Sequence, residues 1–468
     1  MNINELTIIK AREGLEKKEF SSMELTKAFL KEIKEKDSKI NAFITVCEKE
    51  ALLEAQKGDK LIKEGVKKPL LGIPIVFKDN FLTKGIRTTA ASKVLDDYIP
   101  VYNATVVKRL KEAGAIILGK ANMDAWAHGS SGETSDFGVT KNPYDNSRVP
   151  GGSSSGPAVA VSSGMALAAT GTDTGGSVRL PGSFCNVVGL KPTYGRVSRY
   201  GIIAMASSLD SIGHLTKTVA DSALFLSITA GQDRFDATTS PNPVGDYQNN
   251  LQKGIKGLKI GIPKEYFQEG LDKDVKNKAQ EAINEFEKMG VKIEEVSLPH
   301  TKYALAVYYI IQPAEVSSNL ARYDGIRYGS GREMFADEAK RRIMLGTFTL
   351  SSGYWEAYYL KAMKVRTLIK KDFDKVFEKV DALFTPVSPT LPFKIGEKTA
   401  DPLKMYLSDI YTVTANLAGI PGISVPAGFV NNLPLGLQIL GPHFSEDLLF
   451  RLAYHYEQKT EFYKKKAV

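Results

Sequence analysis

The sequence is poor in the residues from which cross-linked and metal-centred proteins are built. Its 468 residues include only two cysteines, Cys47 and Cys185. Two cysteines cannot supply a disulfide framework or a cysteine-based metal cluster, so we expect no structural metal and a reducing compartment. The N-terminal segment lacks the apolar core of a signal peptide, and no stretch approaches the roughly 18 continuous apolar residues of a membrane span. These absences predict a cytoplasmic protein without membrane contact.

Charge and histidine content limit the functions further. The 62 basic and 53 acidic residues leave a formal net charge of +9, which is spread along the chain apart from the tail Lys464–Lys466. We find no basic helix and no aromatic-basic interleaving, so the sequence does not predict direct reading of a nucleic acid. Histidine occurs only five times, and no histidine lies in a glycine-rich or acid-flanked segment.

Glycine, by contrast, is abundant, with 40 residues that cluster between Gly114 and Gly213. Around this cluster the pattern alternates between apolar strands and amphipathic helices, which predicts an α/β fold. The polar segment 234–257 interrupts the alternation, but the same rhythm resumes after it, so we favour one large domain over two. The expected elements include strands at 70–77, 115–118, 166–172, 258–262 and 291–296, helices at 104–113, 157–163, 274–289, 304–320 and 351–377, and a hairpin at 422–429 and 435–440.

Two glycine-serine loops, Gly151–Gly156 and Gly171–Ser177, allow several interpretations. A phosphate-binding loop is disfavoured because Pro157 stands where that motif needs lysine. A flexible linker is also disfavoured, since apolar elements flank both loops. The first loop satisfies G-x-S-x-G around Ser154, as in serine hydrolases, but that mechanism needs a later histidine that the sequence does not clearly offer.

The favoured interpretation pairs the loops with a lysine. A serine hydroxyl needs an adjacent base, and lysine serves as one when burial lowers its pKa. Lys78 is suitably placed, because the apolar run 73–77 precedes it. Successive backbone N–H groups of Thr174, Gly175 and Gly176, which lead into Ser177, can form a concave nest that stabilises an oxyanion. The sequence therefore predicts an acyl-transfer site.

Three segments carry a family resemblance: GIPIVFKDN, PGGSSSGPAVAV and GTDTGGSVRLP are similar to the lysine, first-serine and nucleophile segments of the amidase signature family. The resemblance implies a Ser-cisSer-Lys mechanism, in which Ser177 is the acylated nucleophile, Ser153 relays a proton next to a non-proline cis peptide, and Lys78 is the terminal base. Asp173 and Arg179 would hold the nucleophile loop in shape. The implied fold is a mixed central sheet flanked by helices, in a single domain over 1–468 with a signature core at 70–230 and a pocket-completing helical region at 300–380.

The resemblance covers nearly the whole chain and is strongest to one branch of the family, the glutaminase subunits of tRNA-dependent amidotransferases. RYGIIAMASSLDSIGHLTKTVADSALFL and DPLKMYLSDIYTVTANLAGIPGISVP are among the segments that carry it. It implies hydrolysis of L-glutamine to supply ammonia for amidation of Glu-tRNA(Gln), or of Asp-tRNA(Asn). It also implies a heterotrimer with the B and C subunits of the amidotransferase. The B subunit would bind the misacylated tRNA and use ATP and magnesium, and this chain would need no cofactor. The alternative is a free-standing amidase that acts on a small carboxamide.

A pocket for zwitterionic glutamine needs one cation and one anion. The resemblance assigns these roles to Arg342 and Asp409, and arginine suits a carboxylate because its fork binds two oxygens. Tyr308 is expected to line the same pocket. The sequence departs from the family at 125–128, which reads Ala-Trp-Ala-His where Glu-Phe-Ala-Met is usual, and at Ser155, where glycine is usual.

Overall fold

The computed structural model describes residues 3–326 and 329–467. Within them, eleven strands form one mixed sheet in the order β1-β3-β2-β4-β6-β5-β10-β11-β9-β7-β8. The strands are β1 (Phe43–Val46), β2 (Pro74–Lys78), β3 (Ile116–Ala121), β4 (Ala168–Asp173), β5 (Val188–Lys191), β6 (Ser211–Thr216), β7 (Lys259–Pro263), β8 (Lys292–Val296), β9 (Ala382–Pro386), β10 (Gly422–Val430) and β11 (Leu433–Leu440). The predicted α/β class with a mixed sheet is confirmed.

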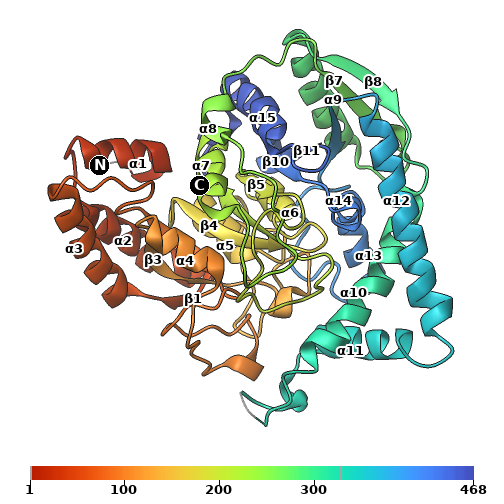
Figure 1. Ribbon diagram of the computed structural model, residues 1–468, viewed down its shortest axis with the longest axis horizontal. Helices are drawn as coiled ribbons and strands as arrows, with labels where there is room; N and C mark the ends of the chain where they lie inside the picture. The colour runs from red at the N-terminus through yellow and green to blue at the C-terminus, as the bar shows by residue number, and fades with distance from the viewer. Residues whose placement is uncertain (1–2, 327–328, 468) are drawn as a thin grey trace.

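Helices surround this sheet (Figure 1). They are α1 (Ile8–Glu16), α2 (Ser22–Ile40), α3 (Glu48–Lys63), α4 (Thr105–Glu112), α5 (Ser155–Ser162), α6 (Arg179–Phe184), α7 (Val219–Thr229), α8 (Tyr247–Asn250), α9 (Lys273–Lys288), α10 (Ala304–Leu320), α11 (Asp337–Thr349), α12 (Lys361–Phe377), α13 (Pro402–Tyr406), α14 (Val413–Ala418) and α15 (Glu446–Thr460). Figure 1 shows α1–α3 at one end of the molecule and α10–α12 at the other. Among the described residues we find no helix that combines the length and apolarity of a bilayer-spanning segment.

Some predicted boundaries shift. The strand expected at 70–77 begins only at Pro74, because the chain turns through Gly72, whose φ is +77°. The helix expected at 351–377 is an α-helix only from Lys361, since residues Trp355–Leu360 form a π-helical turn. The C-terminal hairpin turns at Asn431 and Asn432, whose φ angles of 49° and 65° suit asparagine.

The topology brings the two serine loops to the end of the strand that carries Lys78. Strand β2 lies between β3 and β4 and runs parallel to both, so their carboxyl ends meet at one edge of the sheet. Every residue of β2 is buried, which leaves Lys78 at its last position inside the protein. The loop after β4 leads through Ser177 into α6, and α5 begins within the first glycine-serine loop.

Candidate active site

Lys78 lies at the centre of a cluster of hydroxyl groups. Its Nζ lies 2.8 Å from Ser153 Oγ, 2.9 Å from Ser154 Oγ and 2.8 Å from Thr172 Oγ1. Complete burial lowers the pKa of Lys78 to about 7, against the attraction of Asp124 and other carboxylates, which raises it. A substantial fraction of this amine is therefore neutral at physiological pH and can accept a proton.

Ser153 occupies the position expected of a relay. The Gly152–Ser153 peptide bond is cis, as the family resemblance implied. A side chain at position 152 would overlap the carboxylate of Asp124, so glycine is required there. The backbone N–H of Asp124 donates to the carbonyl of Ser153 at 3.2 Å, and its carboxylate accepts the N–H of Gly132 at 3.0 Å. Asp124 thus supports Ser153 through its backbone, a contact that we did not predict.

Ser154, the serine of the G-x-S-x-G pattern, does not form a hydrolase elbow. Its side chain is fully buried, and its hydroxyl accepts from Lys78 and lies 3.3 Å from the carbonyl of Thr172. Neither late histidine is placed to activate it: His455 donates to the carbonyl of Lys253, and His443 lies next to Gly419. The structure therefore does not support the histidine-dependent alternative.

Ser177 lies on the second loop, directly beside the first. Its carbonyl accepts the N–H of Ser154 at 3.1 Å, which joins the two loops through their backbones. The Ser177 side chain retains a small exposed fraction, 8%. In the described part of the chain no hydrogen bond joins the hydroxyls of Ser153 and Ser177, so the Lys78–Ser153 contact is the one link of the expected relay that is formed.

The nest at 174–177 offers fewer free donors than expected. The N–H of Gly176 donates to the Asp173 carboxylate at 2.9 Å, so this donor is already engaged. The N–H groups of Thr174, Gly175 and Ser177 have no hydrogen-bond partner among the described residues. These three groups are therefore the ones available to an oxyanion.

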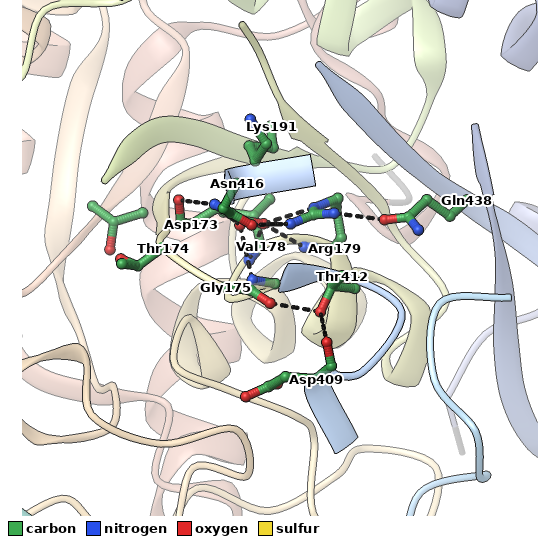
Figure 2. Close-up of polar contacts among 12 residues, drawn as sticks. Asp173, Thr174, Gly175, Val178, Arg179, Lys191, Asp409, Thr412, Asn416 and Gln438 are labelled. Carbon is green, nitrogen blue, oxygen red and sulfur yellow. Dashed lines mark hydrogen bonds and ion pairs between the residues drawn. The ribbon is translucent and has the colours of Figure 1, made fainter. Parts of the chain in front are cut away.

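Asp173 and Arg179 form a fully buried ion pair at the base of this loop (Figure 2). Two hydrogen bonds of 2.9 and 3.0 Å join the guanidinium to the carboxylate, which also accepts the N–H of Val178 at 3.1 Å. Burial by itself would raise the pKa of Asp173, but the ion pair with Arg179 lowers it well below its usual range. These contacts join the pair to the loop that contains Ser177, and its role in holding that loop in shape stays a prediction.

Three C-terminal residues that the sequence did not single out complete this network (Figure 2). Arg179 donates to Asn416 Oδ1 and to Gln438 Oε1, each at 2.6 Å. The Thr412 hydroxyl donates to the carbonyl of Gly175 at 2.6 Å. Because each of these contacts spans at least 237 positions of the chain, no local pattern could have indicated them.

A second feature is a cavity of about 280 Å³ that Arg342 and Ser130 help to line. Asp409 is not part of the lining and lies behind Ser130. The Asp409 carboxylate accepts the Ser130 hydroxyl at 2.7 Å. Burial raises the pKa of Asp409 to about 6, against the effect of the Ser130 hydrogen bond, which lowers it. Arg342 donates to Glu338 and Gln312 at 2.7 Å each, and these bonds use its Nε and one terminal nitrogen.

Tyr309, rather than its neighbour, connects the two charges. The Tyr309 hydroxyl donates to Asp409 at 3.2 Å, and its ring centroid lies 5.3 Å from the Arg342 guanidinium carbon. Tyr308 points elsewhere, with its hydroxyl against Gly175 of the loop that leads to Ser177. Consecutive residues of a helix point about 100° apart, so the two tyrosines of α10 reach the charged pocket and the nucleophile loop, respectively.

Only Ala125 of the unusual segment 125–128 lines the same cavity. The Trp126 ring lies 4.8 Å from that of Tyr323 and 5.2 Å from that of Phe335, measured between centroids. The buried His128 ring has no hydrogen-bond partner in the described part of the chain, and burial together with Arg342 lowers its pKa well below 6.5. His128 therefore adds a neutral imidazole, rather than a cation, near Arg342.

Among the described residues we find no group of three or more histidine, cysteine or acidic side chains that could hold a metal ion.

The amidase family model matches residues 24–450. Over its whole length the chain is 54% identical to the A subunit of the glutamyl-tRNA(Gln) amidotransferase of Geobacter metallireducens, which it also covers completely. It is 54% identical to the same subunit of Carboxydothermus hydrogenoformans, over 98% of this chain and 99% of that one.

Solved structures of other proteins are similar to this chain over nearly its whole length. The corresponding A subunit of Thermotoga maritima superimposes with a TM-score of 0.85 at 47% identity, covering 98% of this chain and 96% of that one. A peptide amidase from Stenotrophomonas maltophilia superimposes with a TM-score of 0.86 at 31% identity, over 98% and 97% of the two chains.

Proposed function

The chain belongs to the amidase family, and on this premise we propose that it is the glutamine-hydrolysing subunit of a glutamyl-tRNA(Gln) amidotransferase. The observation that carries the proposal is the 2.8 Å contact between Ser153 and a buried Lys78 whose pKa is lowered by desolvation to about 7, next to the Ser177 loop. This arrangement provides a base for a serine nucleophile without histidine.

In the proposed reaction, Ser177 Oγ attacks the side-chain carbonyl carbon of glutamine. Its proton passes to Ser153, whose own proton passes to neutral Lys78. The negative oxygen of the tetrahedral intermediate receives hydrogen bonds from the free N–H groups of the nest, such as those of Thr174 and Gly175. Collapse of the intermediate breaks the carbon–nitrogen bond, and the relay returns a proton so that ammonia leaves. Water then hydrolyses the glutamyl ester by the same relay, which releases glutamate and restores Ser177.

The charged cavity supports glutamine as the substrate. We propose that Arg342 binds the α-carboxylate and that Asp409 binds the α-ammonium group. The guanidinium has a terminal nitrogen that the described protein contacts leave available. With a pKa raised by burial to about 6, Asp409 is mostly ionised at neutral pH, as an ammonium partner must be. Tyr309 holds this carboxylate in place, and Tyr308 covers the nucleophile loop.

We further propose that the chain works in the cytoplasm with the B and C subunits of the complex. The B subunit would use the ammonia, with ATP and magnesium, to amidate the tRNA-bound substrate. The chain would therefore contact the tRNA only indirectly, through the B subunit. An exposed apolar surface on and after α11 supports this part of the proposal. On and after α11, five large apolar or aromatic side chains are between 41% and 71% exposed: Met344, Leu345, Phe348, Tyr354 and Tyr358. Apolar patches of this kind are typical of interaction sites.

A free-standing amidase is the weaker candidate, since the whole-length identity to the amidotransferase subunits is 54% and that to the peptide amidase is 31%. The deciding experiment measures ammonia release from glutamine by the chain alone, and again with the B and C subunits, Glu-tRNA(Gln) and ATP. We expect a rise in glutaminase activity in the complete mixture. High activity on simple amides that is indifferent to the partners would instead support the free-standing amidase.

A further inference from the structure

Thr174 begins the nest that precedes Ser177 and lies next to Asp173 and Gly175 (Figure 2). Its own N–H and the N–H of Gly175 are two of the three donors of the nest that have no partner among the described residues. These two N–H groups belong to the two peptides that flank the Cα atom of Thr174. The angle between them therefore depends on the φ and ψ of this one residue, because planar peptides leave the chain only these rotations.

The first of these peptides is held on its carbonyl side. The Asp173 carbonyl accepts the amide nitrogen of Asn416 at 2.9 Å. The Asp173–Thr174 peptide is trans, and in a trans peptide the C=O and N–H groups point in opposite directions. The bond from Asn416 therefore turns the Thr174 N–H away from Asn416. The rotation of Thr174 itself must be fixed through its side chain.

Asp210 holds that side chain. The Thr174 hydroxyl donates to the Asp210 carboxylate at 2.7 Å, and the two residues are only 1% and 4% exposed. This contact follows from the sheet, because β4 and β6 are antiparallel and Asp173 lies opposite Ser211 at the end of their ladder. The next positions of the two chains are Thr174 and Asp210, so the register of the strands brings them face to face.

The same carboxylate also closes the turn that precedes β6. Asp210 accepts the N–H of Met205 at 3.0 Å and that of Ala206 at 3.1 Å. Burial raises the pKa of Asp210, and the hydrogen bonds from Thr174 and Ala206 lower it. A buried carboxylate is costly unless donors surround it, and here the turn and Thr174 supply them. Asp210 is thus a fully bonded acceptor whose position the turn determines.

Two long helices hold this turn in place through Ser208. Glu315 of α10 accepts the N–H of Ser208 at 2.8 Å and its hydroxyl at 2.5 Å. Arg366 of α12 donates to the carbonyl of Ser208 at 2.9 Å. The turn therefore cannot move without breaking contacts to both helices, and its carboxylate stays beside the nest.

We propose that Asp210 is a positioning residue for the oxyanion. By holding the Thr174 hydroxyl, it aims the N–H groups of Thr174 and Gly175 at the oxygen that becomes negative when Ser177 attacks. This inference rests on the proposed glutaminase function. Asp210 acts through Thr174 and does not touch the substrate. Donors that are already aligned stabilise a developing charge without reorganising, so their misalignment slows the chemical step and leaves glutamine binding in the charged pocket intact.

The test measures glutamine hydrolysis by the chain with the B and C subunits, Glu-tRNA(Gln) and ATP. Thr174→Val removes the hydroxyl at nearly constant shape. It should lower kcat by about tenfold or more with an unchanged KM, since outright removal of an oxyanion donor costs about 100- to 1,000-fold. Thr174→Ser, which keeps a hydroxyl, should retain most of the kcat. Asp210→Asn should also lower kcat, and the double variant Thr174→Val/Asp210→Asn should be no slower than the slower single variant, because both changes break one bond.

Asp221→Asn is the matched control. Asp221 is also buried and accepts the N–H groups of Ile8 and Ile9 at 3.0 and 3.1 Å, but it lies beyond the opposite end of β6 from Asp210. Its substitution should leave kcat unchanged, whatever its effect on stability. A kcat loss in Asp221→Asn equal to that in Asp210→Asn would show a general effect of buried carboxylates and overturn the proposal.

The Thr174 variants keep the test decisive even where Asp210→Asn does not fold. An unchanged kcat in Thr174→Val would overturn the inference, and so would a loss that appears in KM alone or that Thr174→Ser shares. Losses that multiply in the double variant would also contradict it. Each of these results requires an active unaltered chain and leaves the glutaminase function standing. No ammonia release by the unaltered chain in the complete mixture would instead overturn the proposed function and this inference together.

Discussion

The hydroxyl of Tyr309 lies 3.2 Å from the Asp409 carboxylate, and the face of the same ring lies next to Arg342. One aromatic side chain therefore orients both charges of the proposed glutamine pocket. Tyr309→Phe should raise the KM for glutamine by about tenfold, the cost of losing a hydrogen bond to a charged group. The measurement is the steady-state kinetics of both Tyr309→Phe and Tyr308→Phe. Because Tyr308 faces the loop that carries Ser177, its variant should change kcat and leave the KM unchanged. An unchanged KM in Tyr309→Phe would contradict the assignment of Arg342 and Asp409 to a glutamine pocket.

Lys78, the proposed base, should govern the pH dependence of acylation. Its active form is the neutral amine, and burial lowers its pKa to about 7. The kcat/KM for glutamine should therefore rise with pH through about 7 and level off above it. Lys78→Ala should reduce acylation by about a thousandfold, within the range for loss of a general base, and Ser177→Ala should abolish it. A Lys78→Ala variant that keeps most of its activity at neutral pH would refute the base assignment.

Asp409 combines a functional role with a cost in stability. Burial raises the pKa of Asp409 from 3.8, its ordinary value, to about 6 in the folded protein. The stabilisation of the fold that comes from this shift is therefore fully present below the unfolded-state pKa and is lost as the pH rises through about 6. Asp409→Asn should then stabilise the fold at pH 8 by about 1–3 kcal/mol and weaken glutamine binding. Urea unfolding at pH 8 and at pH 4 measures the difference. The exposed Asp97→Asn is the control, and equal shifts in both variants would count against the assignment.

The Asp173–Arg179 pair should matter for stability as well as for catalysis. Asp173→Asn leaves a fully buried guanidinium without its counter-charge, which typically costs about 3–5 kcal/mol. It also weakens the acceptor that holds the Gly176 N–H. We expect a lower urea midpoint together with a reduced kcat. Lys370→Ala, which removes an exposed ion pair with Asp374, should cost less than about 1 kcal/mol. If the two variants lost similar amounts of unfolding free energy, the buried Asp173–Arg179 pair would not have the stabilising role that we assign to it.

The exposed face on and after α11 should be needed for assembly and not for folding. Phe348, 50% exposed, lies within a cluster with Tyr354, whose ring centroid is 4.2 Å away. Phe348→Asp should weaken co-purification with the B and C subunits by at least about tenfold, the usual effect of losing a large interface anchor. Its basal glutaminase activity should persist. Val101→Asp, at a 79% exposed position elsewhere, is the control. Intact assembly of Phe348→Asp would exclude this face.

The sequence predicted best those features that short segments encode. The strand that ends at Lys78 and the two glycine-serine loops are each continuous in the chain, and glycine positions dictate their backbone shape. The structure places Lys78 and Ser153 in contact, as the segments implied. The nest was predicted less accurately, because the use of the Gly176 N–H by Asp173 depends on a side-chain conformation that residue order does not specify.

Tertiary structure alone decided which distant residues complete the sites. Gln438 and Asn416 reach Arg179 because β11 and α14 pack beside α6, and Tyr309 rather than Tyr308 meets Asp409 because of how α10 is rotated. The sequence by itself determined the chemistry: a serine, a relay and a lysine that follows an apolar strand. The pKa that makes this lysine a base, however, comes from its complete burial, and only the packed sheet and its helices exclude water from Lys78.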